Sequence, residues 1–196
     1  MTGYINHFAQ LAANAYTGPW AIDADPVRMT AGFDDCVTSY VSFQGTQDWA
    51  QIEADLDIES VDLGELGKVH KGFYDAVRNV LPDIKGVLKD TPHWFIGHSL
   101  GGAEAVLAAA LADPKLVRGV VTFGCPRLCE TSALEQYFHE HEIFVNQFIH
   151  AQDAVPKVPS WMYHASAPTE VGSYEHWLPN LEDHAMSGYL RATAGL

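Results

Sequence analysis

The stretch W-F-I-G-H-S-L-G-G-A, residues 94–103, decides the fold of this 196-residue chain. It joins a short apolar run to an alanine-rich stretch with helical character, residues 100–112. A serine with glycines two residues away on either side is typical of a sharp strand-to-helix turn, where larger side chains would collide. We therefore predict that Ser99 lies at the tip of this turn, beside the N–H groups of a helix N-terminus. Its neighbour His98 is expected to pack rather than to react.

The segments on both sides of this turn alternate between strand and helix patterns. Strands are expected at 27–33, 36–43, 57–62, 93–96, 117–123, 143–149 and within 162–171, and helices at 3–16, 71–90, 100–112, 132–141 and 183–194. Pro82 is expected to kink or split the helix at 71–90. Such alternation is typical of a mostly parallel sheet with helices on both faces. We expect one compact α/β domain over residues 1–196, a length that suits one domain better than two.

The net charge limits the kinds of molecule that this chain is expected to bind. The formal net charge of −14 argues against nucleic acid, because binding phosphate backbones needs clustered lysines and arginines. It also argues against strong attraction to anionic lipid headgroups, but it leaves a neutral lipid or ester interface open. We therefore expect a lipid or ester small molecule as the substrate, with a transient lipid-interface contact, and no nucleic acid.

Cysteine usage and targeting signals are both sparse. The three cysteines, Cys36, Cys125 and Cys129, give no disulfide framework, and the last two are expected to be packing residues or free thiols rather than metal ligands.

No apolar run is long enough to span a bilayer. The N-terminus lacks a basic region followed by an apolar core, which favours a cytoplasmic enzyme. Leaderless export or a longer natural chain are the alternatives.

Residues that could activate Ser99 follow in a suitable order. A serine hydroxyl is a weak nucleophile that needs a histidine base and an acid to orient that base. After this kind of turn the order is serine, acid, histidine. Asp153 lies just beyond the predicted strand 143–149, at the sheet edge where catalytic groups collect. Position favours His184, directly before the last predicted helix, with His176 as its competitor.

Two backbone donors are expected to face the same point. The N–H of Leu100, the residue after the serine, is the first candidate for stabilising an oxyanion. The second is the N–H of Thr46, which follows the predicted strand 36–43, with Gly45 allowing a close approach. The alternative for Gly45 and Thr46 is a simple turn.

These motifs together resemble the class 3 lipase family, the fungal-type lipases of the α/β-hydrolase fold. The similar segments are F-A-Q-L-A-A-N-A-Y (8–16), V-S-F-Q-G-T (41–46), V-H-K-G-F-Y-D-A (69–76), W-F-I-G-H-S-L-G-G-A (94–103), V-T-F-G-C-P-R (121–127), D-A-V-P (153–156) and D-H-x-x-x-x-Y (183–189). The resemblance implies a triad of Ser99, Asp153 and His184, and an oxyanion hole of Thr46 and Leu100. It favours His184 over His176.

The segment 47–56, Q-D-W-A-Q-I-E-A-D-L, is a candidate lid. Trp49, Ile52 and Leu56 are spaced to share one face of a helix, with acids elsewhere. In the family that it resembles, an interfacial lid follows the oxyanion strand. The alternative is an ordinary surface helix, and the short chain leaves room for a small lid at most.

The resemblance implies a serine carboxylic-ester hydrolase, a lipase that cleaves acylglycerols through an acyl-enzyme. Phospholipase A1 and feruloyl-type or short-chain esterase activities are alternatives on the same triad. An alternative of another class is a catalytically silent protein that binds lipids or esters. We expect no metal or organic cofactor, because H-E-x-x-H, paired-cysteine and G-x-G-x-x-G motifs are absent from the sequence.

Overall fold

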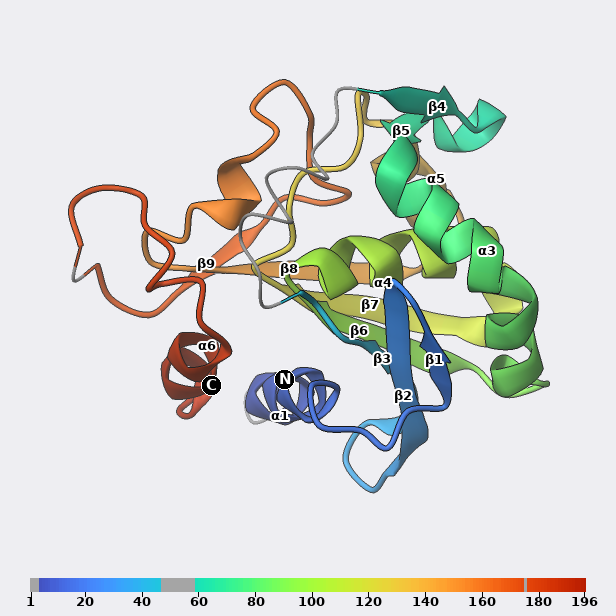
Figure 1. Cartoon of the computed structure of the whole chain (residues 1–196), viewed down its shortest axis with the longest axis horizontal. Coiled ribbons are helices and arrows are strands. Elements are labelled where there is room, and N and C mark those ends of the chain that lie inside the picture. Colours follow the sequence, from blue (N-terminus) through green and yellow to red (C-terminus); the bar gives the residue numbers. More distant parts are fainter. Residues whose placement is uncertain (1–3, 47–58, 175) are drawn as a thin grey trace.

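A computed structural model describes residues 4–46, 59–174 and 176–196 of the chain (Figure 1). Its centre is a seven-stranded sheet with the order β1-β2-β3-β6-β7-β8-β9. The strands are β1 (Ile22–Ala24), β2 (Val27–Asp34), β3 (Thr38–Phe43), β6 (His93–His98), β7 (Val117–Phe123), β8 (Phe144–His150) and β9 (Thr169–Val171). A smaller two-stranded sheet pairs β4 (Ser60–Asp62) with β5 (Lys68–His70).

The pairing of neighbouring strands changes once across the central sheet, from antiparallel to parallel, so β2 alone runs opposite to the other strands. β1, β2 and β3 pair antiparallel, whereas β3, β6, β7, β8 and β9 pair parallel. The β2–β3 hairpin turns at Asp34, whose Oδ1 accepts the N–H groups of Cys36 and Val37 at 2.8 and 3.1 Å. Asp in such a turn satisfies backbone donors that the ladder leaves free. The mostly parallel sheet is confirmed, and the strands predicted at 27–33 and 36–43 pair with each other as this hairpin.

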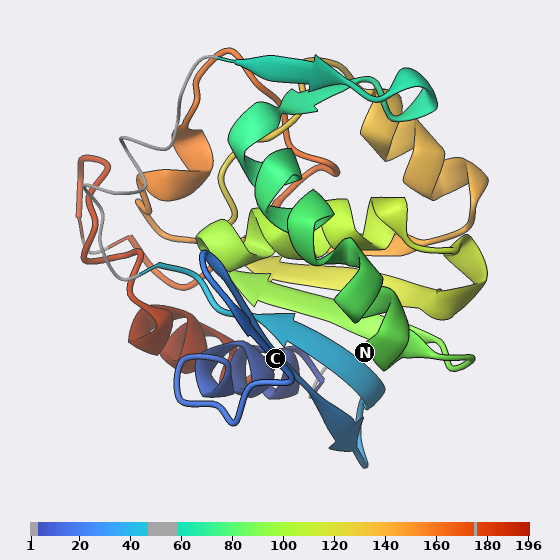
Figure 2. The ribbon, with the colours of Figure 1, turned by 45° about the vertical axis from the view of Figure 1, so that its right-hand side comes forward.

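Helices cover both faces of the sheet, as predicted. α3 (Lys71–Leu88), α4 (Leu100–Leu111) and α5 (Ala133–Glu140) lie on one face. α1 (Ile5–Asn14) and α6 (Met186–Thr193) pack side by side on the other face, so the two ends of the chain meet there (Figures 1 and 2). The first helix and the last helix are therefore neighbours beneath the central strands.

The core is divided by the sheet into two apolar layers. The larger layer holds α4, which is buried on every side from Gly101 to Ala110 because α3 covers it from outside. A helix that is apolar all round is typical of such a position. The smaller layer lies under α1 and α6 and includes Phe8, Phe123 and Phe148.

Three local predictions differ from the structure. β1 and β5 were not predicted, since a three-residue strand is too short to show a period. Only Thr169–Val171 of the segment 162–171 forms a strand. α3 runs continuously from Lys71 to Leu88, so the helix is not split at Pro82, while a kink there stays a prediction. Buried side chains on both sides of Pro82, such as Val80 and Ile84, compensate for the missing hydrogen bond.

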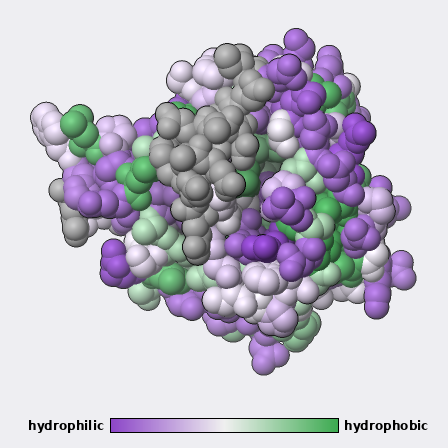
Figure 3. Space-filling view, viewed as in Figure 1, coloured by the Kyte–Doolittle hydropathy of each residue, from purple (hydrophilic) through white to green (hydrophobic). Residues whose placement is uncertain are grey.

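The exposed surface carries hydrophilic and hydrophobic residues interspersed (Figure 3). Within the described ranges, no helix has the length and apolar character that crossing a membrane requires. The candidate lid, Trp49, Ile52 and Leu56 in 47–56, lies outside the described residues.

One acidic side chain lies inside the larger apolar layer. Glu104 on α4 has no exposed surface, and neither carboxyl oxygen has a hydrogen-bond partner among the described residues. Burial raises the pKa of Glu104 well above its ordinary value of 4.5. Because the folded pKa exceeds the unfolded one, this group lowers the stability progressively as the pH rises above about 4.5.

We predict that Glu104→Leu raises the free energy of unfolding at pH 7 by about 1–3 kcal/mol, because an unpartnered buried polar group costs that much. The gain should shrink as the pH falls to 4.5 and below, because the carboxyl is then increasingly protonated in the unfolded state as well. Urea unfolding at several pH values measures it. Glu140→Leu, at an exposed position on α5, is the control and should change little. A loss of stability at pH 7 for Glu104→Leu would contradict this account.

Candidate active site

The turn at Ser99 is built by close approaches of the backbone. β6 ends at His98 and α4 begins at Leu100, so Ser99 alone makes the turn, with φ of 58°. A Cβ at Gly97 would lie 2.1 Å from the carbonyl oxygen of Gly101, and one at Gly101 would lie 2.4 Å from that of Phe43. Neither backbone atom can move aside, so both positions require glycine. The predicted strand–turn–helix arrangement is confirmed.

Ser99, His184 and Asp153 form a continuous hydrogen-bonded row. His184 Nε2 lies 2.8 Å from Ser99 Oγ, and His184 Nδ1 lies 2.8 Å from Asp153 Oδ2. Ser99 and Asp153 have no exposed surface. An imidazole between a hydroxyl and a buried carboxylate can take a proton from the hydroxyl while the carboxylate fixes its tautomer.

His176 does not share this position. Its Nε2 lies 3.3 Å from an oxygen of Glu182 and 4.0 Å from one of Asp183, in the loop that joins β9 to α6. The structure thus brings His184, not His176, to the serine.

Three hydrogen-bond donors surround the carboxyl group of Asp153. Its Oδ1 accepts the N–H of Val155 at 2.9 Å, and its Oδ2 accepts the hydroxyl of Tyr189 at 2.5 Å in addition to His184. Burial raises the pKa of Tyr189 well above its ordinary value, so the phenol keeps the proton that it donates. A buried carboxylate is stable only when such donors satisfy it.

Tyr189 was not assigned a role from the sequence. It is the last residue of the motif at 183–189, on α6, five positions after His184. Gly124 completes the setting, because a Cβ there would lie 2.9 Å from both Asp153 Oδ2 and His184 Nδ1. This explains the glycine in the segment 121–127.

The buried imidazole of His98 supports that of His184. His98 Nε2 lies 2.9 Å from the carbonyl oxygen of His184 and must donate to it, since a carbonyl only accepts. Its Nδ1 therefore accepts the hydroxyl of Tyr16 at 2.7 Å. Burial, with the nearby His184, lowers the pKa of His98 to about 3, so this ring is neutral at pH 7.

The His98 ring also stacks on the His184 ring, with centroids 4.7 Å apart. A neutral ring in this place avoids repulsion when His184 gains a proton. The sequence predicted that His98 packs rather than reacts, and its partners show that it positions the loop bearing His184.

The predicted oxyanion donors come from the two elements that meet at Ser99. Leu100 is the first residue of α4, and its N–H belongs to the unpaired first turn of the helix. A Cβ at Gly45 would lie 2.9 Å from the Cβ of Ser99, so the chain after β3 passes directly against the serine. Because Thr46 directly follows Gly45, the chain at Thr46 also lies close to Ser99.

Cys125 and Cys129 are free thiols in the core, away from solvent. Burial raises the pKa of Cys129 to about 12 and that of Cys125 further still. Both thiols are therefore protonated at neutral pH.

The sheet order, the turn at Ser99 and the row of three side chains define an α/β-hydrolase. The family model "Lipase (class 3)" matches residues 40–163, and the chain belongs to the class 3 lipase family. His184 and α6 lie beyond the matched stretch, and the fold brings them back to Ser99.

Individual relatives agree with this assignment. "Toxin TseL" of Vibrio cholerae is 33% identical over 68% of this chain and 22% of its own length. "Phospholipase A1 PLIP2, chloroplastic" of Arabidopsis thaliana is 30% identical over 66% of this chain and 20% of its own. This chain thus spans about a fifth of these two relatives. The Rhizomucor miehei lipase in its propeptide complex shares the fold, with a TM-score of 0.74, 22% identity, and coverage of 86% of this chain and 68% of that one.

We predict that Tyr16→Phe slows the reaction of Ser99 with an alkyl phosphonate by about tenfold to a hundredfold, because small misplacements of a base cost that much. Unfolding free energy should fall by about 1–3 kcal/mol, since His98 Nδ1 is left without a donor. Labelling kinetics and thermal unfolding measure the two effects. Tyr163→Phe, at an exposed phenol, is the matched control. An unchanged labelling rate in Tyr16→Phe would show that this network does not position His184.

Proposed function

We propose that this chain hydrolyses carboxylic esters of lipids, with acylglycerols as the substrate class and Ser99 as the nucleophile. The observation that carries the proposal is the row from Asp153 through His184 to Ser99, joined by two contacts of 2.8 Å. Membership of the class 3 lipase family supports it.

In the first half-reaction, His184 Nε2 removes the proton of Ser99 as Oγ bonds to the ester carbonyl carbon. The carbonyl π electrons move to oxygen, and the N–H groups of Thr46 and Leu100 stabilise that oxyanion. Asp153 stabilises the imidazolium and keeps its tautomer. The C–O bond to the alcohol then breaks, and the alcohol leaves with the proton from His184.

In the second half-reaction, water takes the place of the alcohol. His184 removes a proton from water, the hydroxide oxygen bonds to the acyl carbon, and a second oxyanion forms in the same place. Its collapse breaks the bond to Ser99 Oγ, which recovers its proton from His184. The products are a fatty acid and the free enzyme.

Phospholipase A1 activity is the second candidate, favoured by the similarity to the Arabidopsis phospholipase A1. Both substrates give the same acyl-enzyme, so the two activities differ in headgroup recognition alone. Comparing fatty-acid release from emulsified triacylglycerol and from phosphatidylcholine vesicles separates them.

We predict that Ser99→Ala lowers turnover of p-nitrophenyl esters by about 10⁶-fold, as loss of a triad serine does elsewhere. Rates for esters from acetate to palmitate measure the activity and its chain-length preference. Ser160→Ala, at an exposed serine, is the control and should keep wild-type rates.

A catalytically silent binding protein would give a different pattern. Wild type would then release no p-nitrophenol, and an alkyl phosphonate would leave Ser99 unmodified. That pair of results would overturn the proposed function.

We also propose that the loop between β9 and α6 contacts the lipid interface. Trp177 is 91% exposed and Leu178 is 66% exposed, at the tip of this loop. Backbone hydrogen bonds join Asn180 to Gln152 and to Ala154, the two residues on either side of Asp153. These bonds anchor the loop beside Asp153. Aromatic and leucine side chains in such a position are typical of contacts with a membrane interface. With a net charge of −14, a neutral or zwitterionic lipid surface suits the chain better than an anionic one.

We predict that Trp177→Ala lowers activity on emulsified substrate by about tenfold, because losing a partly inserted indole costs on the order of 1.5 kcal/mol. Activity on a soluble short-chain ester should not change. Phe33→Ala is the matched control, since Phe33 is 71% exposed but lies at the hairpin end of β2. Equal losses on both substrates would exclude an interfacial role for this loop.

A further inference from the structure

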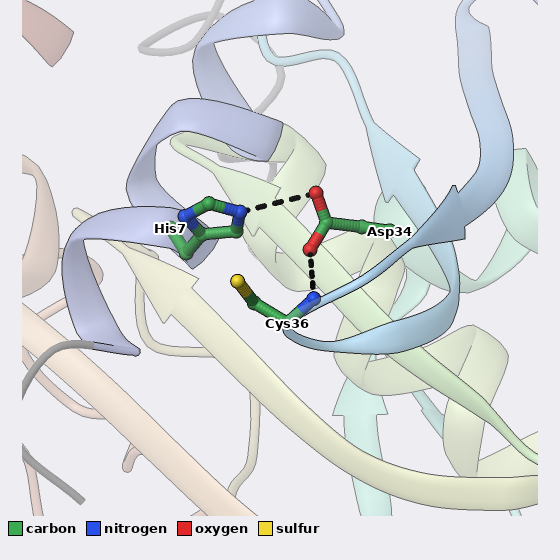
Figure 4. Close-up of side chains that lie close together, drawn as sticks. All are labelled: His7, Asp34 and Cys36. Carbon is green, nitrogen blue, oxygen red and sulfur yellow. Dashed lines mark hydrogen bonds and ion pairs between the residues drawn. The ribbon is translucent and has the colours of Figure 1, made fainter.

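Three side chains able to bind a metal converge at the β2–β3 hairpin. His7 extends from α1, Asp34 lies at the end of β2, and Cys36 lies in the turn that follows (Figure 4). His7 Nε2 is 3.1 Å from Asp34 Oδ2. One ring nitrogen of His7, one carboxylate oxygen of Asp34 and Cys36 Sγ all lie within 4.8 Å of one another.

The hairpin is separate from the row at Ser99. β3 begins at Thr38, beside the turn, and ends at Phe43, after which Gly45 packs against Ser99. The three side chains therefore lie at the opposite end of β3 from the proposed catalytic serine. The hydrolytic mechanism does not use any of them.

The donor set matches a zinc-class ion. Imidazole nitrogen, carboxylate oxygen and thiolate sulfur are the three protein ligands that Zn²⁺ takes, at about 2.0–2.3 Å, in a tetrahedron. Ligand atoms around such an ion lie about 3.3–3.7 Å apart. The nitrogen and oxygen already have nearly that separation, and the sulfur needs a shift of roughly 1 Å or less.

The carboxylate is oriented for this role. Its Oδ1 accepts the N–H groups of Cys36 and Val37, which leaves Oδ2 directed toward His7. Burial opposes ionisation, but these N–H groups and His7 outweigh it and lower the pKa of Asp34. Outer hydrogen bonds of this kind hold metal ligands in place and raise affinity.

The site is open to an incoming ion. The side chain of His7 is 40% exposed, and Cys36 is exposed, unlike the buried thiols Cys125 and Cys129. An entry path from solvent is a requirement for a metal site.

We propose that His7 Nε2, Asp34 Oδ2 and Cys36 Sγ bind a divalent transition-metal ion of the zinc class, with water as the fourth ligand. The ion connects α1 to the β2–β3 hairpin, two elements 27 residues apart at His7 and Asp34. It serves the structure and takes no part in ester hydrolysis.

Binding is coupled to proton movement. The thiol of Cys36 loses its proton to solvent, because the thiolate is the ligand. His7 binds the ion through the lone pair of Nε2, so a proton on that nitrogen passes to solvent or to Nδ1 as the ion enters. Asp34 is already ionised and exchanges its contact with His7 for a bond to the ion.

The test is a titration of the whole chain with Co²⁺, in the presence of a phosphine reductant that keeps Cys36 reduced. A near-ultraviolet thiolate-to-cobalt charge-transfer band should appear, saturate at one equivalent, and disappear when Zn²⁺ is added. Thermal unfolding should shift to higher temperature with Zn²⁺, because the ion binds the folded state.

Variants identify the ligands. Cys36→Ser should lose the charge-transfer band, and His7→Gln should weaken Co²⁺ binding by about tenfold or more. His176→Gln is the matched control, because His176 also faces carboxylates but no thiol, and it should bind as wild type does. Cys36 is exposed and His7 is half-buried, so both variants are expected to fold, which their circular dichroism spectra check.

Two results would overturn the site. One is a wild-type chain that shows no charge-transfer band with excess Co²⁺. The other is a band or an affinity that persists unchanged in Cys36→Ser or His7→Gln, which would place the ion elsewhere.

Discussion

The active-site region depends on a steric constraint at two glycines. The backbones of β3, β6 and α4 approach at one point, where Gly97 faces Gly101 and Gly101 faces Phe43. Any side chain there would separate the strand from the helix. Ser99 holds a left-handed conformation between them, at a cost of about 1–3 kcal/mol. The burial of α4 on all sides offsets that strain, so the core keeps the serine in its reactive place.

Two fully buried carboxyl groups, those of Asp153 and Glu104, differ in their hydrogen-bond partners. Asp153 has three hydrogen-bond donors: the N–H of Val155, the hydroxyl of Tyr189 and the imidazole of His184. Glu104 is equally buried but has no partner among the described residues, and its pKa is raised. Burial without a partner favours the neutral form of the Glu104 carboxyl, whereas the Asp153 oxygens are occupied by hydrogen-bond donors. The same carboxyl chemistry is thus satisfied by hydrogen bonds at Asp153 and costs stability at Glu104.

Segments near the two ends of the chain meet at His184, the proposed general base. Tyr16 follows the first helix and reaches His184, which precedes the last helix, through His98 on the central strand β6. Tyr189 on α6 holds the acid from the other side. Polar contacts between α1, the sheet and α6 therefore hold the imidazole between Ser99 and Asp153, and the mechanism needs only small movements of that ring.

The sequence by itself determined the turn at Ser99, the mostly parallel character of the sheet and the position of Asp153 after β8. These features depend on steric limits and on the periodicity of residues within short stretches, so neighbouring residues determine them. It left His184 and His176 open until family resemblance favoured the former. It did not show Tyr189, the Tyr16–His98 contact or the meeting of His7 with Asp34 and Cys36. Those contacts join residues 27 to 86 positions apart, so only the packing of the helices against the sheet decides them.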